Sequence, residues 1–239
     1  MDADNDQRTR NVNSLDTPQV SSVLERLFGE AERADRPFIT EMLDSAEAGI
    51  DPVARALEAE AEDYKGFYRR AVQNFLCVSP TYGRFLYLCA RAVKAKRVVE
   101  FGTSFGVSAI YLACAVRDNG GGTVIGTELE PSKATRAYEN LTAAGVADLV
   151  DIRIGDAVDV LSSDLGGQVD LVHLDGALSL YRPVLRLLEP RLSSSALVVA
   201  ENSTSDYLDY VTGPGSSYLS LTLPFDRDGR GNELSVFTG

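Results

Sequence analysis

The sequence predicts an α/β fold in which a largely parallel sheet carries helices on both faces and a helical segment precedes the sheet. Between residues 97 and 200, short β-rich runs alternate with helical stretches, the pattern of a parallel sheet covered on both sides. Two later runs, 217–224 and 233–237, flank a turn rich in Asp and Gly at 226–231, which indicates an antiparallel hairpin at the sheet edge. The expected sheet therefore has seven strands, most of them parallel.

The N-terminal part of the chain is expected to be helical after a tail. Residues 1–16 are polar and charged and are expected to form a mobile tail, whereas 17–76 carry apolar residues at helical spacing. Pro37 and Pro52 each suit the first turn of a new helix, and Asp51 is a candidate N-cap. This segment, packed on a core of residues 77–239, would cover a site or pair two subunits, and we expect a homodimer.

The elements of the core follow in order along the chain. A helix is expected after Ser79-Pro80, ending near residue 94, and Gly145 is expected to stop a later helix. The five parallel strands are expected at 97–101, 123–128, 150–154, 169–174 and 196–200, and the helices between them at 106–117, 131–144, 157–164 and 180–192.

The composition narrows the class of partner. The formal net charge is −12, and an acidic surface repels phosphate backbones and anionic lipids. The densest basic cluster, Lys94, Lys96 and Arg97, runs directly into an apolar strand and is interpreted as a solvated helix end. No apolar run approaches the roughly 18 residues that span a bilayer. We therefore expect a small-molecule partner, and neither nucleic acid nor a membrane.

The cysteines indicate a reducing compartment. Cys77, Cys89 and Cys114 are odd in number and lack the spacing of metal ligands or of a redox pair. We interpret them as free thiols. Because no basic-then-apolar segment opens the chain, the expected location is the cytoplasm.

The turn after the first strand indicates the class of ligand. In an open α/β sheet, ligands bind at the carboxyl ends of the strands, and here the first strand leads into the run Glu100-Phe101-Gly102-Thr103-Ser104-Phe105-Gly106. A dinucleotide fold would need further glycines at the positions of Ser104 and Val107. The carboxylate of Glu100 would repel a pyrophosphate but suits a ligand with positive charge and no phosphate. S-adenosylmethionine carries an ammonium and a sulfonium, so the electrostatics favour this methyl donor over NAD.

Two more acids follow the next two strands. Glu128 ends the second strand and could accept hydrogen bonds from both ribose hydroxyls. Asp156 follows the third strand, where its carboxylate could accept from an adenine amino group. Three acids on successive strand ends predict a nucleoside site that includes Glu100, Glu128 and Asp156.

The stretch 97–202 resembles the O-methyltransferase family that includes catechol and caffeoyl-CoA O-methyltransferases. The resemblance rests on the runs VVEFGTSFGVSAIYLA, VIGTELEP, AAGVADLVDIRIGDA, DLVHLD and LVVAEN, and it extends over about residues 76–239 through VSPTYGRFL and NELSVFTG. It implies a class I, Rossmann-like methyltransferase fold. It also implies cofactor contacts from Val78, Ser79, Gly102, Thr103, Ser104, Gly106, Ser108, Glu128, Leu129, Gly155, Asp156, Ala157 and Asp175, with Ser108 on the methionine carboxylate and Glu128 on the ribose.

The same resemblance implies a divalent metal site. The family's Asp, Asp and Asn ligands fall on Asp175, Glu201 and Asn202, which are hard oxygen donors of the kind that Mg²⁺ prefers. Such an ion would hold two neighbouring substrate oxygens and lower the pKa of the attacking hydroxyl. Asp175 is therefore expected to be catalytic, and Tyr181 and Glu233 match family positions that line the site or grip the substrate.

The chain departs from the family pattern at two positions. Glu201 is one methylene longer than the family's Asp, and Leu178 stands where the family has its catalytic lysine. His173, the only histidine, could replace the lysine as base or could be a buried strand residue.

Three hypotheses follow from these departures. The first is metal-assisted O-methylation of a small molecule with neighbouring oxygens. The second is a metal-independent small-molecule methyltransferase. The third is a protein that binds S-adenosylmethionine without transferring its methyl group. RNA methylation is a further alternative, which the net charge of −12 disfavours.

Overall fold

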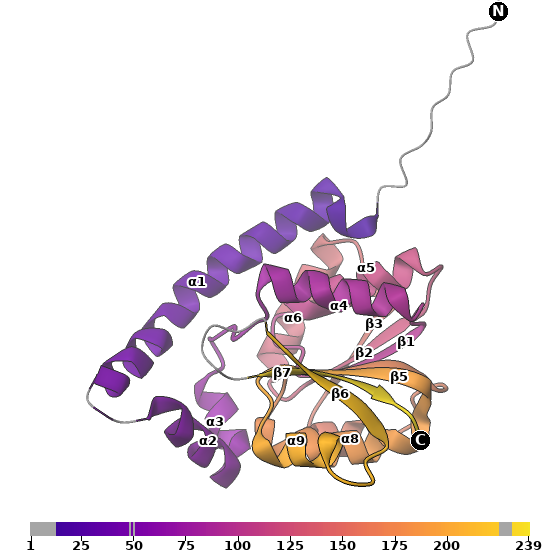
Figure 1. The fold of residues 1–239 in the computed structure, drawn as a ribbon. Helices are drawn as coiled ribbons and strands as arrows, with labels where there is room; N and C mark the ends of the chain where they lie inside the picture. Colours follow the sequence, from indigo (N-terminus) through magenta and orange to yellow (C-terminus); the bar gives the residue numbers. More distant parts are fainter. Residues whose placement is uncertain (1–12, 48, 50, 225–230) are drawn as a thin grey trace, which may run out of the picture.

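The computed structural model describes residues 13–47, 49, 51–224 and 231–239 (Figure 1). Most of the expected tail, residues 1–12, and nearly all of the expected turn at 226–231 lie outside the described residues. Within the described part, a central sheet separates two groups of helices, and the first three helices extend along one side of the molecule (Figure 1).

The sheet confirms the predicted seven strands, in the order β3-β2-β1-β4-β5-β7-β6. All neighbouring pairs are parallel except the two that involve β7, so the last two strands form the expected antiparallel hairpin at one edge. The strands are β1 (Arg97–Phe101), β2 (Thr123–Glu128), β3 (Val150–Ile154), β4 (Val169–Leu174), β5 (Leu192–Ala200), β6 (Tyr218–Leu223) and β7 (Asn232–Phe237).

The helices after residue 79 divide between the two faces of the sheet (Figure 1). On one face lie α4 (Pro80–Ala92), α5 (Val107–Asp118) and α6 (Pro131–Ala143), and on the other α7 (Ala157–Val160), α8 (Tyr181–Leu188) and α9 (Ser205–Thr212). The helix α5 is apolar around its whole circumference and fully buried, because α4 covers its outer side. The helix α9 was not predicted, and α7 and α8 end earlier than expected.

Three helices precede the sheet: α1 (Pro18–Glu47), α2 (Pro52–Glu62) and α3 (Tyr64–Arg70). The expectation that Pro37 opens a new helix is wrong, since Pro37 lies inside α1. Pro37 is exposed there, so water can reach the carbonyl oxygen that loses its N–H partner. The predicted start at Pro52 is confirmed, and Asp51 accepts a hydrogen bond from the Ala54 amide at 3.1 Å. The helical segment that begins at Pro52 is interrupted at Asp63, which caps α3.

The expected mobile tail is corrected at its C-terminal end. Residues 14–16 form one turn of 3₁₀ helix against α5, and the amide and hydroxyl of Ser14 both donate to the carboxylate of Asp118. Leu15 inserts into the core between these elements. One buried apolar residue and one partly buried carboxylate partner therefore hold a segment whose composition is otherwise polar.

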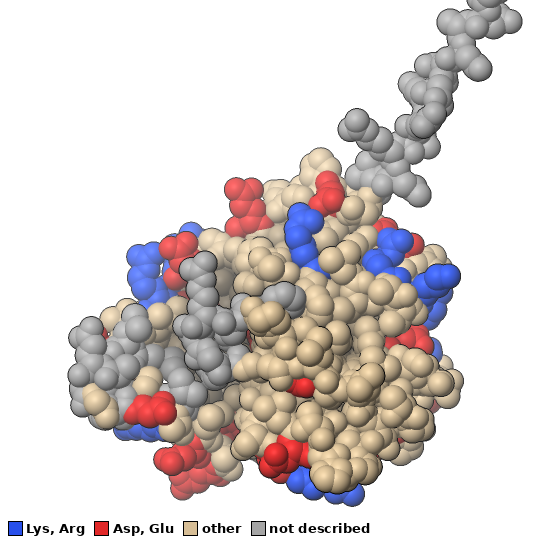
Figure 2. Space-filling view, viewed as in Figure 1, with Lys and Arg blue, Asp and Glu red and all other residues tan. Residues whose placement is uncertain are grey.

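Within the described ranges, none of the helices combines the length and the apolar character needed to cross a membrane. On the face shown in Figure 2, the Lys and Arg side chains are scattered among acidic ones rather than gathered in one patch.

Candidate cofactor and substrate site

A cleft of about 830 Å³ lies at the carboxyl ends of β1 to β4, where the strand order switches between β1 and β4. Helix α3 and residues 75–77 form its outer wall, and Ser108 of α5 lies among its lining residues. The residues after the four strands that line it are Gly102, Thr103, Ser104, Glu128, Leu129, Glu130, Gly155, Asp156, Ala157, Asp175 and Gly176. Most of the cofactor residues implied by the sequence therefore meet in one cleft.

The loop after β1 needs glycine at Gly102. Its φ of 96° is unfavourable for other residues, and a Cβ atom there would lie 2.3 Å from the backbone oxygen of Asp175. The neighbouring Ser104 also has a positive φ, 48°, and its amide donates to Glu128 Oε2 at 2.7 Å. The loop is thereby fixed to the ends of β2 and β4 at once.

Glu128 is the buried acid at the centre of this cleft. Its two carboxylate oxygens accept from the amides of Ser104 and Glu130, at 2.7 and 2.8 Å. Burial raises the pKa of Glu128, against the opposing effects of these two amides and of Lys133. Two N–H donors occupy only part of the acceptor capacity of a carboxylate, so ribose hydroxyls could still donate to it.

Lys133 of α6 is a cofactor-cleft residue that the sequence analysis missed. Its ammonium is almost completely buried and donates to the backbone oxygen of Asn74 at 2.8 Å. Burial lowers its pKa, while Glu128 opposes that change. Lys133 therefore connects the Glu128 side of the cleft to the segment that precedes α4. One lysine in a helical run gives no sequence signal for this role.

Asp156 caps the short helix α7 and also contacts α3. One carboxylate oxygen accepts from the Val158 amide at 3.1 Å. The other accepts from the Tyr64 hydroxyl at 2.5 Å and pairs with the Lys65 ammonium at 2.8 Å. Burial acts to raise the pKa of Asp156, but the bonds from Lys65 and Tyr64 outweigh it and the pKa is lowered. The Asp156 end of the cleft is thus closed by two α3 residues that the sequence analysis did not single out.

A second cavity of about 960 Å³ adjoins the first, between the N-terminal helices and the ends of β4 and β5. Tyr68, Leu76, Cys77, Asp175 and Gly176 line both, so Asp175 lies at their junction. The other residues around the second cavity are Phe38, Ala56, Leu57, Glu60, Phe67, Leu178, Tyr181, Glu201 and Asn202. The three implied metal ligands therefore face one space.

The backbone around these three residues is held by specific contacts. The amide of Asp175 donates to Phe101 O at 2.8 Å, and that of Glu201 donates to Leu174 O at 2.9 Å. Asn202 has a φ of 53°, a conformation that Asn tolerates better than most residues, and its amide donates to the side chain of Asn232 at 2.9 Å.

Asp175 is close enough to Glu201 for its ionisation to be affected. The pKa of Asp175 is raised well above its usual range, first by burial, then by the charge of Glu201 and a hydrogen bond between the two side chains. The described residues include no cluster of three His, Cys, Asp or Glu side chains suited to a metal ion, so the amide of Asn202 would have to supply the third ligand.

Tyr181 lies in the wall of the second cavity, as expected for a residue that lines the site. Its side chain is buried, and its hydroxyl donates to the backbone oxygen of Glu201 at 2.8 Å. Tyr181 thus borders the second cavity but is fixed to the Glu201 backbone, which identifies it as a positioning residue for that turn.

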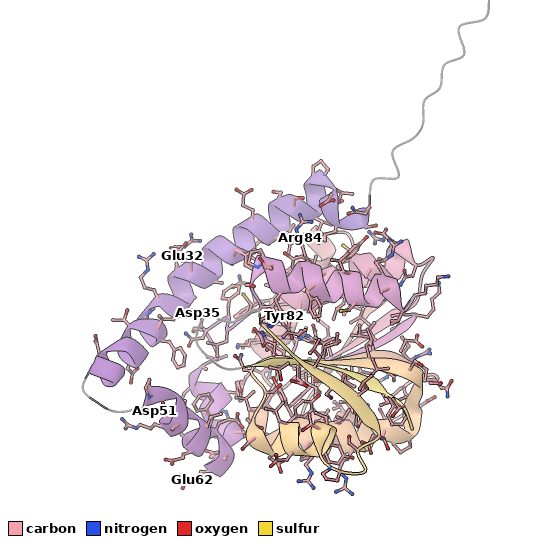
Figure 3. All side chains as sticks on the ribbon, in the orientation of Figure 1. Glu32, Asp35, Asp51, Glu62, Tyr82 and Arg84 are labelled. Atoms are coloured by element: carbon pink, nitrogen blue, oxygen red, sulfur yellow. The ribbon has the colours of Figure 1, made fainter. Side chains whose placement is uncertain are left out.

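Two acids of the N-terminal helices also shape the cavities and were missed. Asp35 lies on the side of α1 that faces the core (Figure 3) and accepts from the amides of Phe75 and Leu76, at 2.7 and 2.9 Å. Glu60 of α2 accepts from the amide of Leu178 at 2.7 Å. Each acid holds a loop that lines a cavity, one before α4 and the other after Asp175. Contacts between segments so far apart in sequence leave no local pattern.

Several predicted site residues lie outside both cavities. Glu100 and His173 are adjacent on β1 and β4, fully buried, with 3.6 Å between Glu100 Oε1 and His173 Nδ1. Tyr82 of α4, labelled in Figure 3, lies next to His173, with 6.0 Å between the two ring centroids. The suggestion that His173 replaces the catalytic base is therefore wrong, because it is enclosed between the sheet and α4. For the same reason the Glu100 side chain does not reach the cofactor cleft.

The remaining predicted residues have structural positions. Val78 is buried behind the cleft, and the Ser79 hydroxyl caps α4 by accepting from the Tyr82 amide at 3.2 Å. Gly106 precedes α5 in a left-handed conformation and does not line the cleft. Glu233 is buried on β7 and accepts from the Thr222 hydroxyl at 2.7 Å, away from both cavities. Residues 75–77, rather than Val78 and Ser79, line the cleft.

A glycine turn, a buried acid after the second strand and a cleft across the switch point together define an α/β protein of the nucleoside-binding class. Comparisons with known proteins narrow this class. A family described as a methyltransferase domain matches residues 99–203. A catechol O-methyltransferase of Mycobacterium tuberculosis is 38% identical over 148 residues, which are 62% of this chain and 63% of the relative.

Two further comparisons agree. A Mycolicibacterium vanbaalenii relative described as an O-methyltransferase is 33% identical over 153 residues, 57% of this chain and 67% of the relative. The structure of the O-methyltransferase TomG from Streptomyces achromogenes, in complex with SAM, aligns with a TM-score of 0.59 and 28% identity, covering 77% of this chain and 90% of that one. The chain belongs to the class I S-adenosylmethionine-dependent O-methyltransferase family. The match to the M. tuberculosis catechol O-methyltransferase spans less than two thirds of that protein.

Proposed function

We propose that this protein transfers the methyl group of S-adenosylmethionine to one hydroxyl of a small aromatic molecule with two neighbouring hydroxyls, assisted by a divalent cation. The observation that carries the proposal is the position of Asp175, which lines both the cofactor cleft and the second cavity. A methyl donor in the first space and an acceptor in the second would meet beside this residue. The names of the curated relatives support a catechol-type acceptor.

The residues of the first cleft suit S-adenosylmethionine. Glu128 retains acceptor capacity for ribose hydroxyls, and the buried hydroxyl of Thr103 has no hydrogen-bond partner within the described protein. The polar groups at the strand ends are mainly acids, which match a cofactor that carries an ammonium and a sulfonium. Because Tyr64 and Lys65 already occupy Asp156, an adenine amino group would have to share or displace these contacts.

The residues at the junction also suit a divalent cation such as Mg²⁺. The pKa of Asp175 is raised first by burial and then by the charge of Glu201, and a doubly charged ion would offset both carboxylate charges. Asp175, Glu201 and Asn202 would hold the ion through oxygen, leaving positions for water and substrate. When bound, the ion supplies the charge that lowers the pKa of a substrate hydroxyl.

The chain's own residues would then mainly orient the two reactants. Methyl transfer forms a carbon–oxygen bond as the carbon–sulfur bond breaks, so it depends on alignment of the acceptor oxygen with the sulfonium methyl. Neither His173, which is enclosed, nor Leu178, which has no titratable group, can take the hydroxyl proton. The proton is expected to leave to solvent before transfer. Phe38, Leu57 and Phe67 supply an apolar wall against which an aromatic ring could pack.

The proposal is tested by incubating the purified protein with methyl-labelled S-adenosylmethionine, catechol and Mg²⁺. We expect a monomethylated catechol in the mass spectrum, and loss of that product when a chelator is in excess. Equal transfer in chelator would contradict metal assistance and support the metal-independent alternative. Cofactor binding with no transfer to catechol or to any other vicinal diol would contradict the proposed reaction and support a binding protein without transfer.

Homodimer formation and a cytoplasmic location stay predictions. Of the two roles expected for the N-terminal helices, cover of the site is supported, because α3 lines both cavities and α2 lines the second. An interface between two copies would have to use other surfaces of these helices.

A further inference from the structure

The second cavity carries an excess of negative charge at one side. Three carboxylates line it, those of Glu60, Asp175 and Glu201, and among the described residues no Lys, Arg or His does so. A cation held by Asp175 and Glu201 would offset their charges. Glu60 would then remain as a charge without a counter-ion in the cavity.

Glu60 is held in place by three hydrogen-bond donors. It is 3% exposed, and it accepts from the Leu178 amide at 2.7 Å, from the Ser179 amide at 3.2 Å and from the Ser179 hydroxyl. All three donors are neutral groups, so none of them places an opposite charge beside the Glu60 side chain. A buried charge that lacks an opposite charge favours a ligand that brings one.

Basic residues close to Glu60 in sequence do not supply the missing charge: Arg55 is exposed and does not line the cavity, and two others contact different acids. Lys65 pairs with Asp156 at the cofactor cleft, and the exposed guanidinium of Arg69 lies 3.9 Å from Glu130. Leu178, which also lines the cavity, has an apolar side chain at the position where the O-methyltransferase family that the chain resembles has a lysine. The chain therefore has fewer cations around the acceptor than the family pattern would give.

We propose that Glu60 determines the charge of the accepted substrate, selecting aromatic diols that carry an ammonium group over those that carry a carboxylate or a phosphate. The inference rests on the proposed function, since it concerns the acceptor of that reaction. The aromatic ring would pack on the apolar wall, the two hydroxyls would face Asp175 and Glu201, and the ammonium would pair with Glu60. An anionic side chain would meet Glu60 without any cation from the described lining.

The test compares three acceptors of one type: catechol, dopamine and dihydroxyphenylacetate. The last two carry side chains of similar length and opposite charge. We expect kcat/KM for dopamine to exceed that for dihydroxyphenylacetate by at least about tenfold, mainly through KM, because the charge is remote from the reacting oxygen. In Glu60→Gln the ratio should fall toward one. Glu62→Gln, the same change on an exposed residue at the outer end of α2 (Figure 3), should leave the ratio unchanged.

A second variant separates charge from anchoring. Ser179→Ala removes a hydrogen bond to Glu60 but keeps its charge, so it should lower the melting temperature and preserve the dopamine preference. If Ser179→Ala abolishes the preference as fully as Glu60→Gln does, Glu60 acts only as an anchor and the proposal is overturned. Turnover of catechol with no preference between the charged acceptors also overturns it, while leaving the proposed function intact. If none of the three acceptors is methylated, the result would count against the proposed function instead.

Discussion

Replacing Asp175 by asparagine is expected to reduce Mg²⁺-stimulated methyl transfer by at least about a hundredfold, since a metal-bound oxygen gains several kcal/mol of charge stabilisation. Asparagine keeps the shape of the side chain but removes one of the two charges that would hold the ion. Cofactor affinity should change much less, because Glu128 and Asp156 lie on other strand ends. Parallel measurements of turnover and of S-adenosylhomocysteine binding check both parts.

The same variant should be more stable than the wild type when no metal is present. A pKa of Asp175 raised in the folded state means that its stability contribution is present below the ordinary aspartate value, about pH 4, and is lost as pH rises through the folded value. At neutral pH in chelator, Asp175→Asn should therefore melt at a higher temperature, and the difference should shrink toward pH 4. Mg²⁺ should raise the melting temperature of the wild type only. Equal stabilisation of both proteins by Mg²⁺ would place the ion elsewhere.

Replacing Glu128 by alanine is expected to weaken S-adenosylhomocysteine binding by about a hundredfold or more. The loss includes hydrogen bonds from the ribose to a charged acceptor, each worth about 1.5–3 kcal/mol. It also leaves the amides of Ser104 and Glu130 without their partner, so the loop after β1 should lose its fixed position. Isothermal titration calorimetry on folded protein measures the effect.

The control for Glu128→Ala is Glu139→Ala, an exposed acid on α6. This variant has the same change of charge, but Glu139 lies outside both cavities. Its affinity for S-adenosylhomocysteine should therefore match that of the wild type. If the two variants bind equally, Glu128 does not contact the cofactor. The cleft at the ends of β1 to β4 would then not be the nucleoside site.

The strands of the fold could be predicted closely because each combines β-branched residues with a turn signal at its end. The first four expected strands coincide with β1 to β4. The helices were harder. Pro37 is a reliable breaker only where its lost hydrogen bond cannot be hydrated, and α9 lacks a strong apolar stripe, since only Tyr207 and Val211 are buried.

The site could be predicted only where it lies on strand ends. Glu128, Asp156 and Asp175 follow strands whose ends must meet, so topology alone brings them together. Glu60 and Lys133 reach the cavities from helices through contacts that tertiary packing decides.

His173 and Glu100 were predicted to belong to the site but lie outside both cavities. Both are polar residues of central strands, but the alternation of side chains along a strand directs them to the face covered by α4. A position near the end of a strand is therefore not enough to place a side chain in the cleft. The face of the sheet on which the side chain lies decides whether it can reach the ligand.

A crystal structure of the protein with S-adenosylhomocysteine, Mg²⁺ and catechol would show whether donor and acceptor meet at Asp175. We expect the nucleoside in the cleft beside Glu128, the ion on Asp175, Glu201 and Asn202, and the catechol ring in the second cavity, with one hydroxyl oxygen pointing at the cofactor sulfur. Nucleoside density outside this cleft, or catechol bound away from Asp175 with the cofactor in place, would contradict this expectation.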